Sequence, residues 1–253
     1  MSTSEFKIRA KSVLAKTYWM SFLASLIYVL IQGAVTTLTS RISSIGSGYD
    51  TTRFEAALEN GNFERAMEEL SKMQGATGAM SIVSWIISTC VTLFVLNVLI
   101  VGINKVYVNA RKNLQVDIGD LFAPFKTYLP VVKTMFFHYL YIFLWSLLFI
   151  IPGIVKSYSY FMVPYILTEN PNIETKRAFE ISKTTMNGEK GNCFVLSLSF
   201  IGWYLLGVIC CCIGIYFVQP YFEASKAEFY AYVKNKALTT GIATPADFGE
   251  AVA

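Results

Sequence analysis

The chain has 253 residues, of which 54% are hydrophobic and only 15% are charged, and its formal net charge is +4. Soluble domains carry about 25% charged residues, because Lys, Glu, Arg and Asp cover most of their surface, so the composition excludes an ordinary soluble fold. Five cysteines over this length exclude a disulfide-rich secreted scaffold. We therefore expect an all-α, polytopic helical membrane protein that forms a single integral membrane domain over residues 1–253.

Residues 2–16 predict a short amphipathic helix at the membrane interface. Ser2 and Glu5 have the spacing of a capping box. One face of this helix would be formed by Phe6, Ala10, Val13 and Thr17. The apolar run that follows is about 20 residues long, which exceeds the 7–15 residues of a signal-peptide core, so we expect it to be retained as the first span.

Lys, Arg, Asp and Glu leave four windows of the sequence free of charge. These windows are residues 17–40, 73–104, 134–155 and 191–222, with lengths of 24, 32, 22 and 32 residues. A helix needs about 20 apolar residues to cross a hydrocarbon layer of about 30 Å, so each window can hold a span.

Two shorter stretches decide between four spans and six. Ile154–Thr168 is a second apolar stretch after the third window, and the segment after Gly214 is apolar but carries Glu223, Lys226 and Glu228. Six spans with both termini in the cytoplasm would place 16 of the 21 Lys and Arg residues inside, whereas four spans would place 12 inside. Because Lys and Arg accumulate in cytoplasmic segments, six spans are favoured and four remain the alternative.

The last two hairpins resemble each other in sequence. Each contains a tryptophan, then Gly-Ile, then Pro-Tyr, and we expect the glycine to let the chain turn. A parallel repeat or a chance likeness would both explain the pattern. The matching residues are Trp145, Gly153 and Pro164 in one hairpin and Trp203, Gly214 and Pro220 in the other.

Three segments outside the spans have predictions of their own. Residues 39–78 are expected to form an extracytoplasmic helical insert with two helical stretches around Asn60-Gly61, serving either as a lid or partner-docking hairpin or as a solvated insert on the membrane surface. Asp120 is predicted to cap a short helix, in preference to forming a metal site with Asp117. Residues 237–253 are expected to be a flexible C-terminal tail.

Several motifs resemble a bacterial family of integral membrane proteins catalogued only as a domain of unknown function. The residues that carry the resemblance are IPGIVKSYSYFMVPYILTENP, LSFIGWYLLG, GIYFVQPYFEASKAEFYAYV, IGDLFAPFK and IRAKSVLAKTYW. The family is also distantly similar to the membrane domain of some glycerophosphodiester phosphodiesterases. The resemblance supports a membrane protein and implies no activity, cofactor or catalytic residue.

The motifs of common enzymes are missing from the sequence. His138 is the only histidine, so a Ser-His-Asp arrangement would have to use it, and we expect an interfacial hydrogen-bonding role for it instead. Cys210, Cys211 and Cys212 are adjacent, which is unlike the spaced ligands of a metal site. No catalytic residue, cofactor or metal is predicted.

Polar residues within the spans are the best candidates for a functional site, because polar groups are costly at membrane depth. Glu223 and Lys226 are three residues apart and can pair on one helix face. The complete candidate set is Glu223, Lys226, Asn97, Gln32 and Gln219.

The sequence thus predicts a non-enzymatic integral protein of the bacterial cytoplasmic membrane, acting as an accessory protein or in envelope or lipid homeostasis. The alternative is a small transporter or channel with a polar path near Glu223 and Lys226. Membrane lipids are the expected partners, with a possible protein partner through residues 39–78, and the dispersed charge gives no basic patch for nucleic acid.

Overall fold

The computed structural model describes residues 2–47, 51–69, 71, 86–87, 89–209 and 214–250. The chain forms two units. The first comprises Met1–Val29 and Leu96–Ala253, and the second comprises Leu30–Val95. Helix α1 (Thr3–Ser47) contributes to both units.

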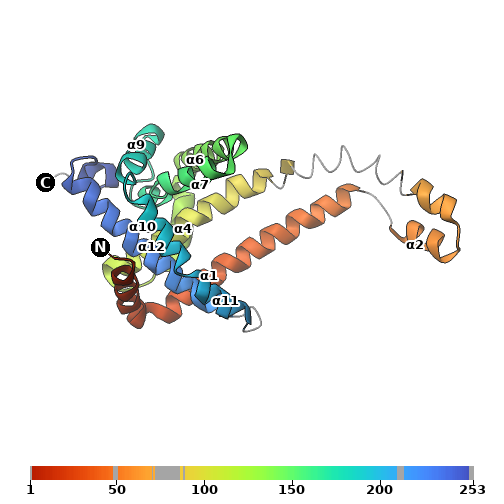
Figure 1. Cartoon of the computed structure of the whole chain (residues 1–253), viewed down its shortest axis with the longest axis horizontal. Helices are drawn as coiled ribbons and strands as arrows, with labels where there is room; N and C mark the ends of the chain where they lie inside the picture. The colour runs from red at the N-terminus through yellow and green to blue at the C-terminus, as the bar shows by residue number, and fades with distance from the viewer. Residues whose placement is uncertain are drawn as a thin grey trace. The chain divides into compact units, whose positions relative to one another are not determined.

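The first unit is built from helices (Figure 1). After α1 these are α4 (Asn97–Asn113), α5 (Gly119–Phe122), α6 (Tyr128–Leu148), α7 (Ile150–Ser159), α8 (Val163–Glu169), α9 (Thr175–Thr185), α10 (Lys190–Leu198), α11 (Ile201–Ile209) and α12 (Gly214–Thr239). The 3-10 helices η2 (Ala123–Thr127) and η3 (Pro245–Phe248) complete it, and a π-helical turn η1 (Thr92–Leu96) precedes α4.

Five helical segments of the described chain are long and apolar enough to cross a membrane. They are Thr3–Arg41, Thr89–Asn113, Gly119–Leu148, Ile150–Glu169 and Lys190–Ile209. These segments confirm an all-helical chain with several helices fit for membrane crossing. Helix α12 is not among them, and it carries Glu223, Lys226 and Glu228 in its middle.

Helix α4 lies at the centre of the first unit, where it packs against α5, α6, α8 and α12. Its residues Val98, Val101 and Val106 are fully buried. Gly102 allows the closest approach, because a Cβ atom at this position would collide with the backbone carbonyl of Leu121 at α5.

The predicted apolar face at the start of α1 is confirmed, but residues 2–16 do not form a separate short helix, because α1 is one helix from Thr3 to Ser47. The backbone N–H of Ser2 donates to Glu5 over 3.0 Å, as a capping box requires. The predicted apolar face is buried throughout, with exposed fractions of 9% or less at Phe6, Ala10, Val13 and Thr17. Phe6 packs edge-on against Phe229 of α12 with ring centroids 5.4 Å apart, so this face packs against the helical core.

In both C-terminal hairpins a glycine lies against the preceding helix. The expectation that Gly153 forms the turn is wrong, because the chain turns at Phe149 and Gly153 lies inside α7; residues 210–213, before Gly214, lie outside the described residues. Gly153 of α7 leaves no room for a Cβ against Ser146 of α6, and Gly214 of α12 lies against Gly207 of α11. Each contact joins residues seven positions apart, and α6–α7 and α11–α12 are closely packed pairs (Figure 1). The shared contact agrees with the predicted resemblance between the hairpins.

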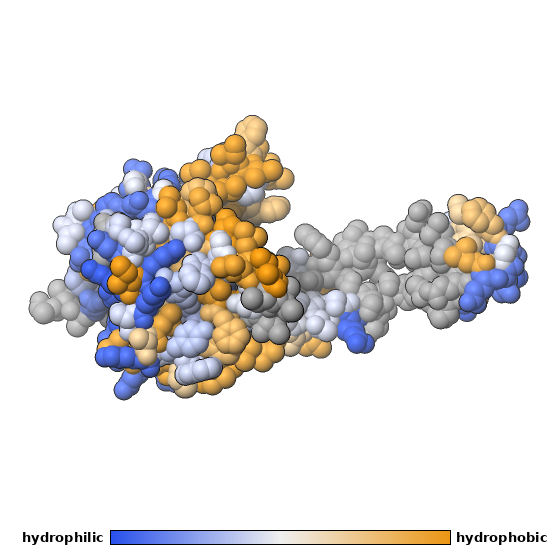
Figure 2. All heavy atoms as spheres, turned by 60° about the horizontal axis from the view of Figure 1, so that its bottom comes forward, coloured by the Kyte–Doolittle hydropathy of each residue, from blue (hydrophilic) through white to orange (hydrophobic). Residues whose placement is uncertain are grey.

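Large apolar side chains remain exposed on both hairpins. Ile150, Ile151 and Ile209 are each more than 70% exposed. Figure 2 shows hydrophobic side chains over much of the first unit and hydrophilic ones gathered at the end that holds the C-terminal segment. An exposed apolar surface of this extent is typical of a lipid-facing one.

The C-terminal segment differs from the flexible tail that we expected. Phe248 of η3 is 2% exposed, and Arg177 of α9 donates to Asp247 over 3.2 and 3.0 Å. Thr244 and Asp247 form a capping box at the start of η3. These specific contacts hold residues 240–250 against the other helices of the first unit; residues 251–253 lie outside the described residues.

The prediction that Asp120 caps a helix is wrong. It is the carboxylate of Asp117 that accepts the backbone N–H of Gly119, over 2.8 Å, at the start of α5. Asp120 lies inside α5 and accepts a hydrogen bond of 2.7 Å from Asn109 of α4. The carboxylate of Asp120 therefore binds a residue of another helix, although the local sequence predicted that it would cap α5.

The second unit contains the two helical stretches predicted around Asn60-Gly61. Helix α2 (Thr51–Glu59) ends at this turn, where Gly61 has a φ of 64°, and residues 63–69 are helical again. Ala57 and Ala66 are buried, at 8% and 2% exposure. The rest of the predicted insert, residues 72–78, lies outside the described residues.

Candidate functional site

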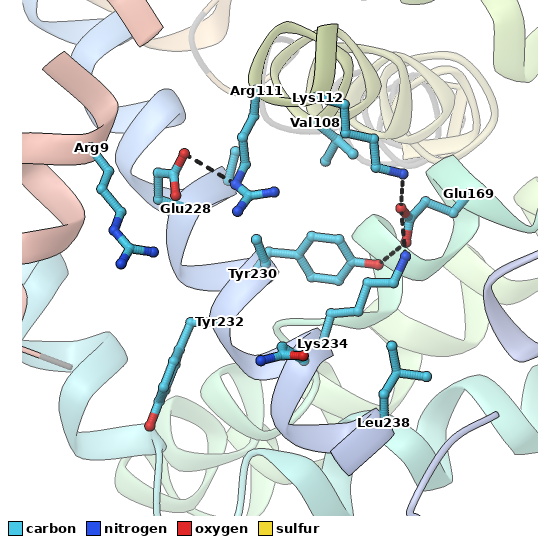
Figure 3. A pocket seen from close by; sticks show the side chains of 13 residues that line it. Arg9, Val108, Arg111, Lys112, Glu169, Glu228, Tyr230, Tyr232, Lys234 and Leu238 are labelled. Carbon is cyan, nitrogen blue, oxygen red and sulfur yellow. Dashed lines mark hydrogen bonds and ion pairs between the residues drawn. The ribbon is translucent and has the colours of Figure 1, made fainter. Parts of the chain in front are cut away.

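A pocket of about 350 Å³ lies where the polar ends of four helices of the first unit meet. Figure 3 shows its charged side chains, which come from α1, α4, α8 and α12. The cations are Arg9, Arg111, Lys112 and Lys234, and the carboxylates are Glu169 and Glu228. With four cations against two carboxylates, the pocket favours an anion.

The end of α4 places two of these cations. The helix stops at Leu114, whose φ of 54° lies in the left-handed region and whose N–H closes the last turn on Ala110. Arg111 and Lys112 thus lie in the last turn, where cations are favoured because the carbonyl end of a helix carries partial negative charge.

Glu169 is the most strongly held group of the pocket. Its carboxylate accepts hydrogen bonds from Lys112, from Lys234 over 2.9 Å and from the Tyr230 hydroxyl over 2.6 Å. Its side chain is 6% exposed. Both oxygens of this buried carboxylate have donors, so this half of the pocket is a structural network that joins α4, α8 and α12.

The other half of the pocket keeps unused donors. Arg111 Nε lies 3.1 Å from Oε1 of Glu228, whose side chain is 6% exposed, but the N–H is not aligned for a hydrogen bond. Arg9 is exposed and has no ion pair or side-chain hydrogen bond among the described residues. In Figure 3 both guanidinium groups extend toward the open space beside Glu228.

Two guanidinium groups with free N–H donors suit a phosphate or carboxylate, because the planar guanidinium can bind two oxygens of the same group at once. The pocket lining contains no cysteine, serine, threonine or histidine. The described residues contain no group of three His, Cys, Asp or Glu side chains that could hold a metal.

Three of the five residues singled out from the sequence lie together at another place. Gln219 donates to Glu223 over 2.9 Å, and Lys226 lies 2.8 Å from the other carboxylate oxygen of Glu223. These three line a cavity of about 220 Å³ together with Asn104. The hydroxyl of Tyr204 donates to Gln219 over 3.0 Å.

The other two candidates are not in this cavity. Asn97 is 3% exposed and its Nδ2 has no partner, but it does not line the cavity. Gln32 belongs to the second unit. Sequence reasoning missed Asn104, which follows Asn97 by two helical turns on the same face of α4; that spacing was the available signal.

Among the described residues, His138, Cys90 and Cys193 line neither cavity. His138 is 8% exposed between Tyr139, Tyr160 and Phe179, and its Nδ1 has no hydrogen-bond partner. The expected hydrogen-bonding role is thus absent at Nδ1. The triplet of residues 210–212 lies outside the described residues.

Sequence reasoning missed the basic pocket because Arg9, Arg111, Lys112 and Lys234 were read only as charges that delimit spans. Nothing local in the sequence connects residues so far apart. The clearest available signal was Glu169, a lone acid at the end of an apolar stretch, where a carboxylate needs a cation.

The comparisons with known proteins agree with the predicted resemblance and add no activity. No curated protein and no solved structure matches the chain, so the distant likeness to the membrane domain of glycerophosphodiester phosphodiesterases stays a prediction. The match to a family model covers α7 to α12, which include Glu169, Glu223 and Lys234 but neither Arg9 nor Arg111. Residues 149–237 match the model of the family described as Protein of unknown function (DUF975).

Proposed function

We propose that this chain is a non-enzymatic integral protein of the bacterial cytoplasmic membrane that binds the phosphate of an anionic lipid head group in the basic pocket. Such binding would make it an accessory protein of lipid or envelope homeostasis. The observation that carries the proposal is the pair of guanidinium groups, Arg9 and Arg111, with unused donors beside the same opening.

The positions of the pocket residues along the chain support six spans with both termini in the cytoplasm. Arg9, Lys112, Glu169 and Lys234 line one pocket and so lie on one side of a membrane. Between each consecutive pair the chain must cross an even number of times. The five apolar segments supply two crossings between Arg9 and Lys112 and two between Lys112 and Glu169, but one between Glu169 and Lys234. Helix α12 would therefore provide the sixth crossing.

The cytoplasmic side is supported by charge. Six spans with this pocket inside give 16 of the 21 Lys and Arg residues a cytoplasmic position. Basic pockets between helices at the cytoplasmic surface are typical binding places for anionic lipid head groups. The insert at residues 39–78 would then be extracytoplasmic and accessible to a protein partner.

Lipid retention in native mass spectrometry tests the proposal. The purified chain in detergent is mixed with equal amounts of phosphatidylglycerol and phosphatidylcholine that carry the same acyl chains. We expect preferential retention of phosphatidylglycerol, and a loss of about threefold to tenfold in Arg9→Gln, because one charge-assisted contact is removed. Equal retention of both lipids, or complete displacement by inorganic phosphate, would contradict a lipid head-group site.

A second candidate function, transport of a small solute, is favoured by a separate observation. Gln219, Glu223 and Lys226 face one cavity between α1, α4 and α12, and the flanking segments Thr3–Arg41 and Thr89–Asn113 are among the apolar helices fit for membrane crossing. A charged pair facing a cavity within such helices is typical of a solute path.

A further inference from the structure

The cavity at Glu223 differs from the head-group pocket in shape, lining and charge. It measures about 220 Å³, and its polar lining comes from Ser25, Tyr28, Asn104, Gln219, Glu223 and Lys226. Two isoleucines of α4 supply the apolar part of the wall. At about 30 Å³ for each water molecule, this volume accommodates a compact solute of a few heavy atoms.

Asn104 shows that the cavity has unused binding capacity. Its residue is 5% exposed, it lines the cavity, and its amide makes no hydrogen bond to any other described residue. The oxygen and nitrogen of this amide therefore keep their hydrogen-bonding capacity toward the cavity. A ligand in the cavity can accept from and donate to this amide.

The ion pair sets the charge of the ligand. Nζ of Lys226 lies 2.8 Å from Oε2 of Glu223, and the side chains of Glu223 and Lys226 are 9% and 23% exposed. Both side chains line the cavity. Because their charges cancel, a simple anion is attracted by Lys226 and repelled by Glu223, and a simple cation experiences the reverse. A molecule with both charges can align its ammonium with Glu223 and its carboxylate with Lys226.

The ion pair also leaves the atoms that this alignment needs. Oε1 of Glu223 accepts a hydrogen bond from Gln219, Oε2 forms the ion pair with Lys226, and each oxygen can accept a further hydrogen bond. The ammonium of Lys226 has three N–H donors and uses one on Glu223. The remaining donors and lone pairs complement a small zwitterion.

We propose that this cavity binds a small zwitterionic solute of the α-amino-acid class, with its ammonium on Glu223, its carboxylate on Lys226 and a further hydrogen bond to Asn104. The proposal rests on the second candidate function, since it names the class of solute that a transport path through this cavity would carry. It does not depend on the head-group pocket, because the two cavities share no lining residue.

Calorimetric titration of the full chain in lipid nanodiscs tests the charge requirement without any substitution. The probes are alanine, propionate and ethylammonium, of which only alanine carries both charges. We expect alanine to bind with a Kd of about 1 mM, and each single-charge compound to bind at least about tenfold more weakly, because one buried charge would face no partner. Comparable binding of all three compounds, or no binding of alanine, would overturn the proposal.

Two substitutions on the same helix separate the site from its surroundings. Asn104→Leu should weaken alanine binding about tenfold, whereas Asn97→Leu, which replaces another buried and unpartnered amide of α4 outside the cavity, should change it less than about twofold. Equal losses in both variants would contradict the placement of the solute at Asn104.

A third variant distinguishes this proposal from the proposed head-group function. Arg9→Gln should lower the retention of phosphatidylglycerol and leave alanine binding unchanged. If alanine binding fails while lipid retention persists, only the zwitterion site is wrong. If retention fails while alanine binds, only the head-group site is wrong.

Discussion

Nζ of Lys234 lies 2.9 Å from Oε1 of Glu169, although the two residues are 65 positions apart in the chain. This ion pair places the start of the segment 169–190 at the same end of the first unit as the C-terminal part of α12. A four-span topology would separate these two segments across the membrane, so the pair bears directly on the number of spans.

The topology can be tested with a membrane-impermeant thiol reagent on single cysteines in a cysteine-free background. Lys176→Cys is exposed at the start of α9 and should be unreactive in intact cells and reactive after the membrane is opened. Asn60→Cys, exposed in the second unit, should react in intact cells. Labelling of Lys176→Cys in intact cells would contradict the six-span topology and favour four spans.

Loss of the Glu169 charge should destabilise the first unit. Glu169→Gln leaves Lys234, whose side chain is 11% exposed, with only the half-exposed carboxylate of Glu250 as a partner, and we expect a cost of about 2–4 kcal/mol in the free energy of unfolding. The control is Glu180→Gln, because Glu180 pairs with Arg177 at 66% side-chain exposure and should contribute less than about 1 kcal/mol. If both substitutions lowered the stability in thermal unfolding by the same amount, the buried network would contribute no more than an exposed ion pair.

A methyl group at Gly102 should be poorly tolerated. Gly102→Ala would place its Cβ against the backbone carbonyl of Leu121, which cannot move as a side chain can, and we expect a loss of about 1–3 kcal/mol. Gly202→Ala is the matched control, because a Cβ there meets nothing within 4 Å and alanine is favoured over glycine inside a helix by about 0.5–1 kcal/mol. If Gly102→Ala were as stable as Gly202→Ala, the close contact between α4 and α5 would be in doubt.

The attachment of the C-terminal segment should depend on pH. Hydrogen bonds from Arg177 hold the pKa of Asp247 below its ordinary value; burial opposes this shift, and bonds from Thr244 add to it. A lowered folded-state pKa stabilises the segment at pH values above the ordinary pKa of aspartate, and this stability is lost as the pH falls through the folded-state value.

Hydrogen exchange of residues 241–250 measures this dependence. We expect protection that is constant near neutral pH and declines below about pH 4. Asp247→Asn should show weak protection at neutral pH and little change on acidification. Protection that falls equally with pH in both proteins would assign the effect to another group.

Local patterns of the sequence predicted the features that are determined by residues close together in the chain. The buried face of Phe6, Ala10 and Val13 follows from helical spacing, and the turn at Gly61 from the preference of glycine for positive φ. The pairing of Glu223 with Lys226 also follows from their i,i+3 spacing, and these residues do meet.

The remaining features depend on tertiary packing. Asp120 was assigned to capping because its partner, Asn109, lies on another helix. Residues 240–250 look like a tail in sequence, but Arg177 and Asn170 bind them from α9 and the end of α8. Arg9 and Arg111 line one pocket because the start of α1 and the end of α4 both reach it, and no local pattern of the sequence encodes that arrangement.

The most direct test of the head-group pocket compares substitutions inside the pocket with the loss of a charge outside it. Arg9→Gln and Arg111→Lys alter the pocket, the second while keeping its charge but losing the planar donor group, and Lys126→Gln removes an exposed charge outside it. With binding of short-chain phosphatidylglycerol measured as Kd, both pocket variants should bind about threefold to tenfold more weakly, and Lys126→Gln should match the unaltered chain. Equal weakening in Arg9→Gln and Lys126→Gln would mean that overall charge, and not this pocket, attracts the lipid.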